Sequence, residues 1–253
     1  MVKQSFLSDR SKEIILGSLL GDGSLRIHKP YTNARFSFRH AWDQKDYFFW
    51  KVSELKEISS EKCWWQQDGP DGLGGRKLRY QSLALEALTD IYRLTHKKDK
   101  LVIRRKWLNQ LTPLSLAIWW LDDGSLIGHG KRGVFCTDPF SYKDQKILAR
   151  YLLKVWNVRV AIAKITRMRD GKQKEYYRLW IRSSEELKKF LRIILPYVPV
   201  ATMLPKVLIL YRDSQLQQRW ISEVVEKSIF SQTVVEFYLD EKRKKYKRFQ
   251  KMI

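Results

Sequence analysis

Two aspartates, Asp22 and Asp123, are the side chains best placed to do chemistry, because each ends a similar apolar run. Residues 15–24 read Ile-Leu-Gly-Ser-Leu-Leu-Gly-Asp-Gly-Ser, and residues 116–125 read Leu-Ala-Ile-Trp-Trp-Leu-Asp-Asp-Gly-Ser. A carboxylate at the C-terminal end of a helix meets the partial negative charge of the last carbonyls, and a divalent cation reverses that sign. Hard oxygen ligands with no His or Cys nearby indicate Mg²⁺ rather than Zn²⁺. Two such acids with metal ions are suited to hydrolysing a phosphodiester.

The charge of the chain favours a polyanionic partner. With 49 Lys and Arg against 27 Asp and Glu, the formal net charge is +22. Nucleic acid is the first candidate, and an anionic membrane surface ranks last because the basic faces lie on predicted strands rather than on an amphipathic helix. The longest uncharged stretch, 107–121, is shorter than the roughly 20 residues that a bilayer requires. Charged residues near the start argue against a secretory leader.

Cysteine usage narrows the class further. Cys63 and Cys136 are the two cysteines, which excludes a disulfide scaffold and a zinc site built from several thiolates. A reducing compartment is therefore expected.

The two apolar runs are expected to be helices that begin similar halves of the chain. The first helix is expected to begin at Ser8 or Asp9. The second is expected to have Thr112 as its N-cap and Pro113 as its first helical residue. Gly17 and Gly21 lie on one face of the first helix, so close packing of the two helices would bring Asp22 and Asp123 together. The other expected elements are strands or extended segments at 34–40, 77–81, 134–136, 158–166 and 176–182, and helices at 43–58, 83–94, 142–156 and from 183.

This pattern predicts an α+β fold of two αββαββα repeats that are about one hundred residues apart, the size of a small domain. The first repeat is expected to occupy residues 1–100 and the second residues 101–253, with a linker at 97–106 and a basic tail at 242–251.

Basic and polar side chains alternate with apolar ones along the predicted strands. Arg35, Ser37 and Arg39 project to one face and Phe36 and Phe38 to the other. Such a ribbon fits the DNA major groove, where Arg reads guanine and Gln reads adenine. The candidate DNA-binding residues are Arg26, His28, Arg35, Ser37, Arg39, Lys77, Arg79, Gln81, Arg178, Trp180 and Arg182. The basic run 242–248 is either a phosphate-binding arm or the frayed end of a helix.

Both decapeptides resemble the signature of the LAGLIDADG homing endonucleases, and segment 111–125 is especially similar to the second motif of their single-chain, intron-encoded branch. The resemblance extends from about Ser8 to about Leu208. It implies the two repeats described above, arranged around a pseudo-twofold axis with the packed motif helices at the centre. Ile118 departs from the pattern because Gly17 holds the matching place in the first motif. Helix contact there is expected to be looser or to be made by Ala117.

The resemblance also implies roles for individual residues. The acid before the final glycine of each motif binds metal, which points to Asp22 and Asp123. The backbone carbonyls of Gly21 and Asp122 could add metal oxygens, and the Asp122 side chain is secondary. The family places a lysine near each acid. These positions match Lys100, with Lys98 as its alternative, and Lys206 in the sequence Met-Leu-Pro-Lys.

The expected function is site-specific, Mg²⁺-dependent cleavage of both strands of a long asymmetric double-stranded DNA target, leaving short 3′ overhangs. Mn²⁺ or Ca²⁺ could replace Mg²⁺ in binding. Because one chain supplies both acids, we expect a monomer. An intron RNA maturase and a non-cleaving DNA-binding regulator of the same fold are the alternatives. The expected location is an organelle (mitochondrion or chloroplast) or the bacterial cytoplasm, without secretion. Residues typical of protein splicing are not seen beside the two repeats, so an intein is not expected.

Overall fold

The structure is a computed structural model that describes residues 6–68, 75–128, 130–169 and 171–251. It contains two compact units, Met1–Asp122 and Asp123–Ile253. The predicted boundary near residue 100 follows the repeat in the sequence, whereas the compact units divide at the end of the second motif helix. Most of that helix therefore belongs to the first unit.

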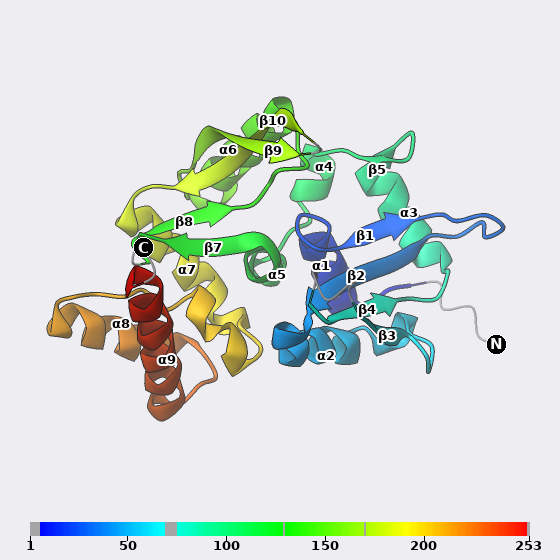
Figure 1. Cartoon of the computed structure of the whole chain (residues 1–253). Helices are drawn as coiled ribbons and strands as arrows, with labels where there is room; N and C mark the ends of the chain where they lie inside the picture. Colours follow the sequence, from blue (N-terminus) through cyan, green and yellow to red (C-terminus); the bar gives the residue numbers. More distant parts are fainter. Residues whose placement is uncertain (1–5, 69–74, 129, 170, 252–253) are drawn as a thin grey trace. The chain divides into compact units, whose positions relative to one another are not determined.

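The first unit has the predicted αββαββα order, followed by a hairpin and two helices. Its elements are α1 (Asp9–Ser18), β1 (Ser24–Arg26), β2 (Arg35–Ala41), α2 (Lys45–Glu54), β3 (Trp64–Gln67), β4 (Lys77–Gln81), α3 (Glu86–Thr95), β5 (His96–Lys97), β6 (Lys100–Leu101), α4 (Arg105–Leu108) and most of α5 (Pro113–Asp123). Short 3₁₀ turns at Trp42–Gln44 and Lys56–Ile58 flank α2. The four main strands form an antiparallel sheet in the order β1-β2-β4-β3 (Figure 1).

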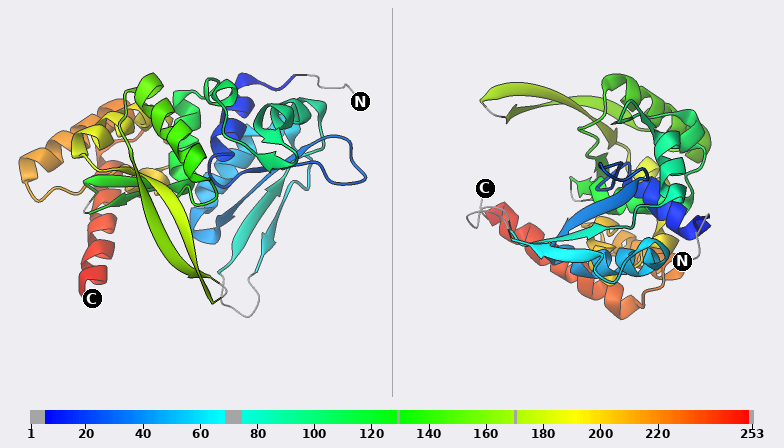
Figure 2. Two further views of the ribbon diagram at one scale, coloured as in Figure 1. Left: turned by 90° about the horizontal axis from the view of Figure 1, so that it is seen from above. Right: turned by 90° about the vertical axis from the view of Figure 1, so that its right-hand side faces the viewer.

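Together with α5, the second unit repeats the αββαββα order and then adds helices. Its elements are β7 (Gly124–Ile127), β8 (Arg132–Phe135), α6 (Tyr142–Trp156), β9 (Ala161–Arg169), β10 (Lys172–Ile181), α7 (Ser184–Ile194), the 3₁₀ segments η4 (Leu195–Tyr197) and η5 (Ala201–Lys206), α8 (Ser214–Lys227) and α9 (Gln232–Lys251). The strand order β7-β8-β10-β9 matches that of the first unit, and β9 with β10 forms a long ribbon (Figure 2). The predicted α+β class with a repeated αββαββα order is confirmed.

The motif helices begin where their caps predict and pack closely within the first unit. The Ser8 side chain accepts a hydrogen bond from the Ser11 amide, and Thr112 Oγ1 accepts one from Ser115 at 3.3 Å. A Cβ added to Gly17 would lie 2.4 Å from the Ser115 carbonyl oxygen and 2.9 Å from Ile118 Cβ. The contact at Ile118 is therefore close, not loose, because the glycine opposite leaves room for the larger side chain.

Each sheet buries one face. In the first unit Phe36, Phe38, Leu78 and Tyr80 are buried, as the alternation of the sequence predicts. In the second unit the corresponding buried side chains are those of Phe135, Leu179 and Ile181. Within the described residues, no helix combines the length and apolar character needed to span a membrane.

Three segments differ from the sequence expectation or extend it. The predicted linker at 97–106 folds into the β5–β6 hairpin and the start of α4, with Lys98 and Asp99 at positive φ in the turn. Strand β3 was not predicted, because its Trp-Trp-Gln-Gln sequence does not alternate. Helices α8 and α9 extend the second unit beyond the repeat. The Gly-rich sequence at 68–75 is typical of a turn, but it lies mostly outside the described residues.

Candidate active site and nucleic-acid interface

The register of the first sheet gathers the predicted DNA-binding residues on one face. Arg26 is paired with Arg35, Ser37 with Gln81, and Arg39 with Arg79. Residues directly opposite one another on antiparallel strands share a face. Lys77, at the end of β4, lies on the same face, whereas His28 is exposed just beyond β1. The polar face of this sheet therefore carries most of the predicted DNA-binding residues.

The predicted metal-binding acid opens onto that face. Asp22 lines a groove together with Arg26, Arg39 and Arg79, and with Ser37 and Gln81 from the same face. The Asp22 side chain is 37% exposed, so its carboxylate is accessible to an ion from solvent. An acid and a row of cationic and amide side chains thus share one groove within the first unit.

The groove also contains an aromatic residue that the sequence reasoning missed. Trp65 is paired with Arg79 and is 44% exposed on the polar face. Its neighbour Trp64 is 43% exposed on the opposite face, where its ring packs edge-on against Phe49. The paired tryptophans could not be assigned to faces before β3 was known.

Behind Asp22 lies a buried polar cluster that is centred on the Asp122 carboxylate. Tyr47 donates a hydrogen bond to Asp122 Oδ1 at 2.9 Å, and Lys51 Nζ lies 3.2 and 3.1 Å from the two carboxylate oxygens. The Asp22 amide donates to Asp122 Oδ2 at 3.4 Å. Burial, followed by the charge of Asp122, raises the pKa of Tyr47 well above its usual range. The Asp122 side chain is thus fully buried, and its charge is paired with that of a fully buried lysine, Lys51.

His40 connects this cluster with Asp22. Its Nδ1 lies 3.4 Å from Asp22 Oδ2, and its Nε2 lies 3.9 Å from Asp122 Oδ1. The sequence-based preference for Mg²⁺ assumed that no His or Cys lies near the acids. That assumption is wrong, because strand β2 brings a histidine from eighteen positions along the chain to the first acid.

His40, Tyr47 and Lys51 were all missed from the sequence, although weak signals for them exist. His40 falls on the buried side of the alternating strand, with Phe36 and Phe38. Tyr47 and Lys51 are four residues apart on a helix, which places them on one face. Polar residues at core positions need buried partners, and here the partner is Asp122.

In the second unit, Asp123 and Lys206 lie close enough to the Cys136 thiol to influence its ionisation. The Cys136 amide donates to the Asp123 carbonyl at 3.0 Å. Burial raises the pKa of Cys136, Arg178 and Lys206 lower it, and Asp123 and Asp138 raise it. The charges of Asp123 and Lys206 thus both contribute to the electrostatic environment of the Cys136 thiol.

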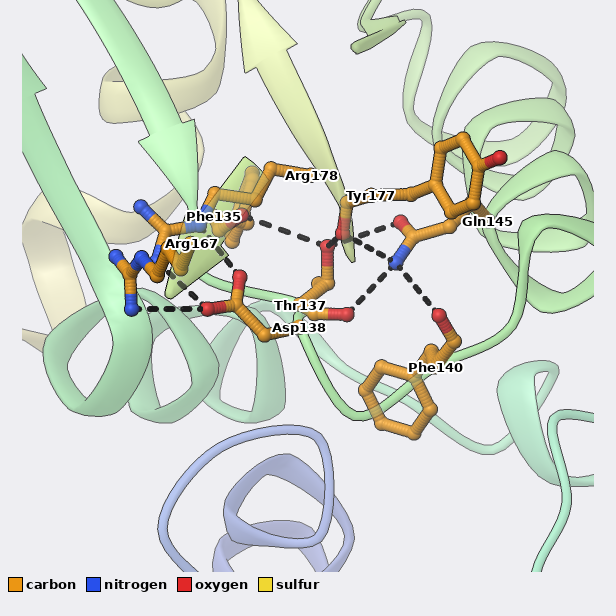
Figure 3. A network of polar contacts seen from close by, with 8 residues as sticks. All are labelled: Phe135, Thr137, Asp138, Phe140, Gln145, Arg167, Tyr177 and Arg178. Atoms are coloured by element: carbon orange, nitrogen blue, oxygen red, sulfur yellow. Dashed lines mark hydrogen bonds and ion pairs between the residues drawn. The ribbon is translucent and has the colours of Figure 1, made fainter. Parts of the chain in front are cut away.

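Arg178, a predicted DNA-binding residue, is held by an acid (Figure 3). Its guanidinium contacts both oxygens of Asp138, at 2.5 and 2.8 Å, and its side chain is 14% exposed. Arg167 reaches the same carboxylate at 3.4 Å. The adjoining loop is fixed by Gln145, which donates to the carbonyls of Thr137 and Tyr177. The Arg178 guanidinium is thus oriented by Asp138, within the second unit.

The remaining predicted residues are placed less centrally. Trp180 is half-buried opposite Ala161, and Arg182 is exposed just past the end of β10. Lys98 and Lys100 are exposed in the β5–β6 hairpin. The structure brings a different lysine, Lys51, to the ends of the motif helices, and the role of Lys100 stays a prediction.

The basic tail is helical, and its first lysine has a structural position. Lys242, in α9, donates to the carbonyls of Pro205 and Leu208 at 2.6 and 2.7 Å, on either side of Lys206. Burial lowers the pKa of Lys242 to about 7. This residue supports the segment that carries Lys206 and is not part of a free phosphate-binding arm.

The lowered pKa predicts a pH dependence of stability. The unfolded chain holds the Lys242 proton up to about pH 10.4, whereas the folded chain releases it above about pH 7. The free energy of unfolding should therefore rise with pH between these values. Melting temperatures measured from pH 7 to 9.5 should show a steeper rise for the wild type than for Lys242→Met. The control is Lys244→Met, an exposed lysine of the same helix. If the melting temperatures of wild type and Lys242→Met rise equally with pH, Lys242 does not have a lowered pKa in the folded chain.

Comparison with known proteins agrees with the resemblance of the motifs. The model of the LAGLIDADG DNA endonuclease family matches residues 12–190. The protein RecA of Mycobacterium gastri is 29% identical over 212 residues, which cover 78% of this chain and 47% of that protein. The cytochrome b mRNA maturase bI2 of Saccharomyces cerevisiae is 27% identical over 195 residues, covering 73% and 44%. The chain spans about half the length of these relatives.

Two further likenesses cover most of the matched protein. The DNA endonuclease I-ChuI of Chlamydomonas applanata is 25% identical, covering 66% of this chain and 81% of that protein. The structure of the homing endonuclease I-WcaI bound to its DNA recognition sequence superposes with a TM-score of 0.69 at 20% identity, covering 83% of this chain and 91% of that one. The second likeness concerns the fold.

Proposed function

Because the chain belongs to the LAGLIDADG DNA endonuclease family, we propose that it is a site-specific homing endonuclease that makes a double-strand break by metal-dependent hydrolysis. Mg²⁺ is the proposed physiological ion, and short 3′ overhangs are the proposed product ends. The observation that carries the proposal is the groove of the first unit, where Asp22 opens among Arg26, Arg39 and Arg79.

We propose the following roles for the residues. Asp22 and Asp123 each hold metal at one scissile phosphate, with the carbonyls of Gly21 and Asp122 as further oxygen donors. The metal, when bound, supplies the Lewis acid that offsets charge on the phosphate. Lys206 adds positive charge beside Asp123, and Lys100 is proposed to do so in the first half. The polar faces of the two sheets bind the duplex and fix its register.

We propose a monomer on an asymmetric target, because the two polar faces differ. In the first unit Ser37 lies opposite Gln81 and Arg39 opposite Arg79. In the second, Arg178 and Trp180 lie opposite Ala163 and Ala161. Unlike faces read unlike half-sites, so the target is not a palindrome.

The test is cleavage of plasmid DNA that carries the uninterrupted form of the host gene. With Mg²⁺, the purified chain should linearise this plasmid once and leave a scrambled-site control intact. Sequencing of the ends gives the overhang. Failure to cut either this plasmid or a randomised duplex library would contradict the proposal.

A maturase that assists splicing of its intron RNA is the second candidate. The similarity to a yeast cytochrome b mRNA maturase favours it. Splicing of the host intron RNA with and without the chain separates the two candidates, and one protein could do both. An organelle or the bacterial cytoplasm is the proposed location.

The exposed tryptophans offer a matched test of the interface. Trp65→Ala should weaken binding of the target duplex about tenfold, or ~1.4 kcal/mol, because a large aromatic side chain leaves the proposed DNA face. Trp64→Ala removes an equally exposed ring from the opposite face and should leave the affinity unchanged. Fluorescence anisotropy with labelled duplex and Ca²⁺ measures both. Equal effects of the two substitutions would show that this face does not contact DNA.

A further inference from the structure

We propose that His40 is a nitrogen ligand of the metal that Asp22 holds, so that the first half-site prefers transition-metal ions such as Co²⁺ over Mg²⁺. This inference rests on the proposed function, because it concerns the same metal site.

The imidazole of His40 is fully buried and lacks ordinary partners. Its side chain has no exposed surface, and neither ring nitrogen makes a hydrogen bond within the described part of the chain. A buried polar group without a partner costs about 1–3 kcal/mol. Within the described residues, His40, Asp22 and Asp122 are the group of potential ligands that converge on one point. The ring therefore points into a site that a cation would complete.

The two ring nitrogens face different carboxylates. Nδ1 lies 3.4 Å from Oδ2 of the accessible Asp22, while Nε2 lies 3.9 Å from the buried Asp122. Metal-bound histidines commonly donate their second N–H to a carboxylate, which fixes the tautomer and the ring orientation. With the proton on Nε2, Nδ1 and Asp22 Oδ2 present lone pairs to each other. An ion that bonds to each at about 2.0–2.2 Å would satisfy both.

Asp122 is less suited than Asp22 to binding the ion, and at 3.9 Å from His40 Nε2 it faces the ring without a hydrogen bond to it. Lys51 already lies 3.1 Å from Asp122 Oδ2, and Tyr47 donates to Oδ1. The charge of this carboxylate is therefore compensated from the protein side. The Asp22 side chain, by contrast, is 37% exposed and lines the groove.

The second unit differs at the matching position. Ser37 and Val134 hold equivalent places opposite Ser24 and Ser125, and three residues further along are His40 and Thr137. Thr137 is buried, and its hydroxyl donates to Gln145 at 2.9 Å (Figure 3). The first unit thus has an imidazole at this position, where the second unit has a threonine. Imidazole favours later transition metals, whereas an all-oxygen site suits Mg²⁺ and Ca²⁺, so the two half-sites should differ in metal preference.

The experiment measures ion binding without DNA cleavage. The full chain carrying Cys136→Ser, which removes the thiol near Asp123, is titrated with Co²⁺ by visible absorption and with Mg²⁺ by calorimetry. His40→Ala should weaken Co²⁺ binding about tenfold or more and change Mg²⁺ binding much less. Asp22→Asn should weaken both. His96→Ala, which removes a histidine of the β5–β6 hairpin, is the matched control and should change neither.

Folding is checked by thermal unfolding, and His40→Gln replaces His40→Ala if the smaller side chain prevents folding. If the folded His40 variants bind Co²⁺ as tightly as the parent while Asp22→Asn does not, His40 is not a ligand and the inference is overturned. In that case DNA cleavage by the wild type would leave the proposed function intact. A parent that neither binds ions nor cuts DNA overturns both.

Discussion

Asp22→Asn and Asp123→Asn are each expected to abolish double-strand cleavage. The substitution keeps the shape of the side chain but removes the charge that holds metal at a phosphate. Loss of metal assistance should slow hydrolysis at that phosphate at least about a thousandfold, or ~4 kcal/mol. Affinity for the duplex should stay within about threefold, because the acids do not read bases.

The measurement resolves the two strands. Supercoiled plasmid with the target site is incubated with each variant, and nicked and linear products are separated over time. Asp46→Asn, which alters an exposed acid in the first turn of α2, is the control and should cut like the wild type. Full linearisation by Asp22→Asn or by Asp123→Asn would refute the assignment of that acid.

The second large effect concerns stability. Lys51→Met is expected to lower the free energy of unfolding by about 3–5 kcal/mol, because it leaves the buried Asp122 carboxylate without its compensating charge. Tyr47 and the Asp22 amide continue to donate to Asp122, but neither carries a positive charge.

Adding Asp122→Asn to Lys51→Met should recover most of that loss, since the buried charge is then absent from both partners. Urea denaturation followed by circular dichroism measures the single and double variants. Lys56→Met, at an exposed lysine just past α2, should have almost no effect. If the single and double variants unfold at the same urea concentration, the pair does not contribute to stability as described.

Much of the fold was determined by local features of the sequence. Ser8 and Thr112 are helix caps because their hydroxyls accept nearby backbone N–H groups, which requires only neighbouring residues. The alternation at Arg35–Ala41 decides which side chains are buried, since successive residues of a strand point to opposite faces. The two apolar runs that end in Asp-Gly-Ser likewise indicated the repeat.

Tertiary structure alone decided what surrounds the acids. His40, Lys51 and Asp122 come from a strand and two helices that are distant in sequence, and no local spacing specifies that they meet. The face of Trp65 depended on the pairing of β3 with β4. Arg178 could be assigned to a strand from the sequence, but its pairing with Asp138 depends on the loop that Gln145 fixes. Periodicity reports which side of an element is buried, whereas the identity of a buried partner is set by the packing of the whole unit.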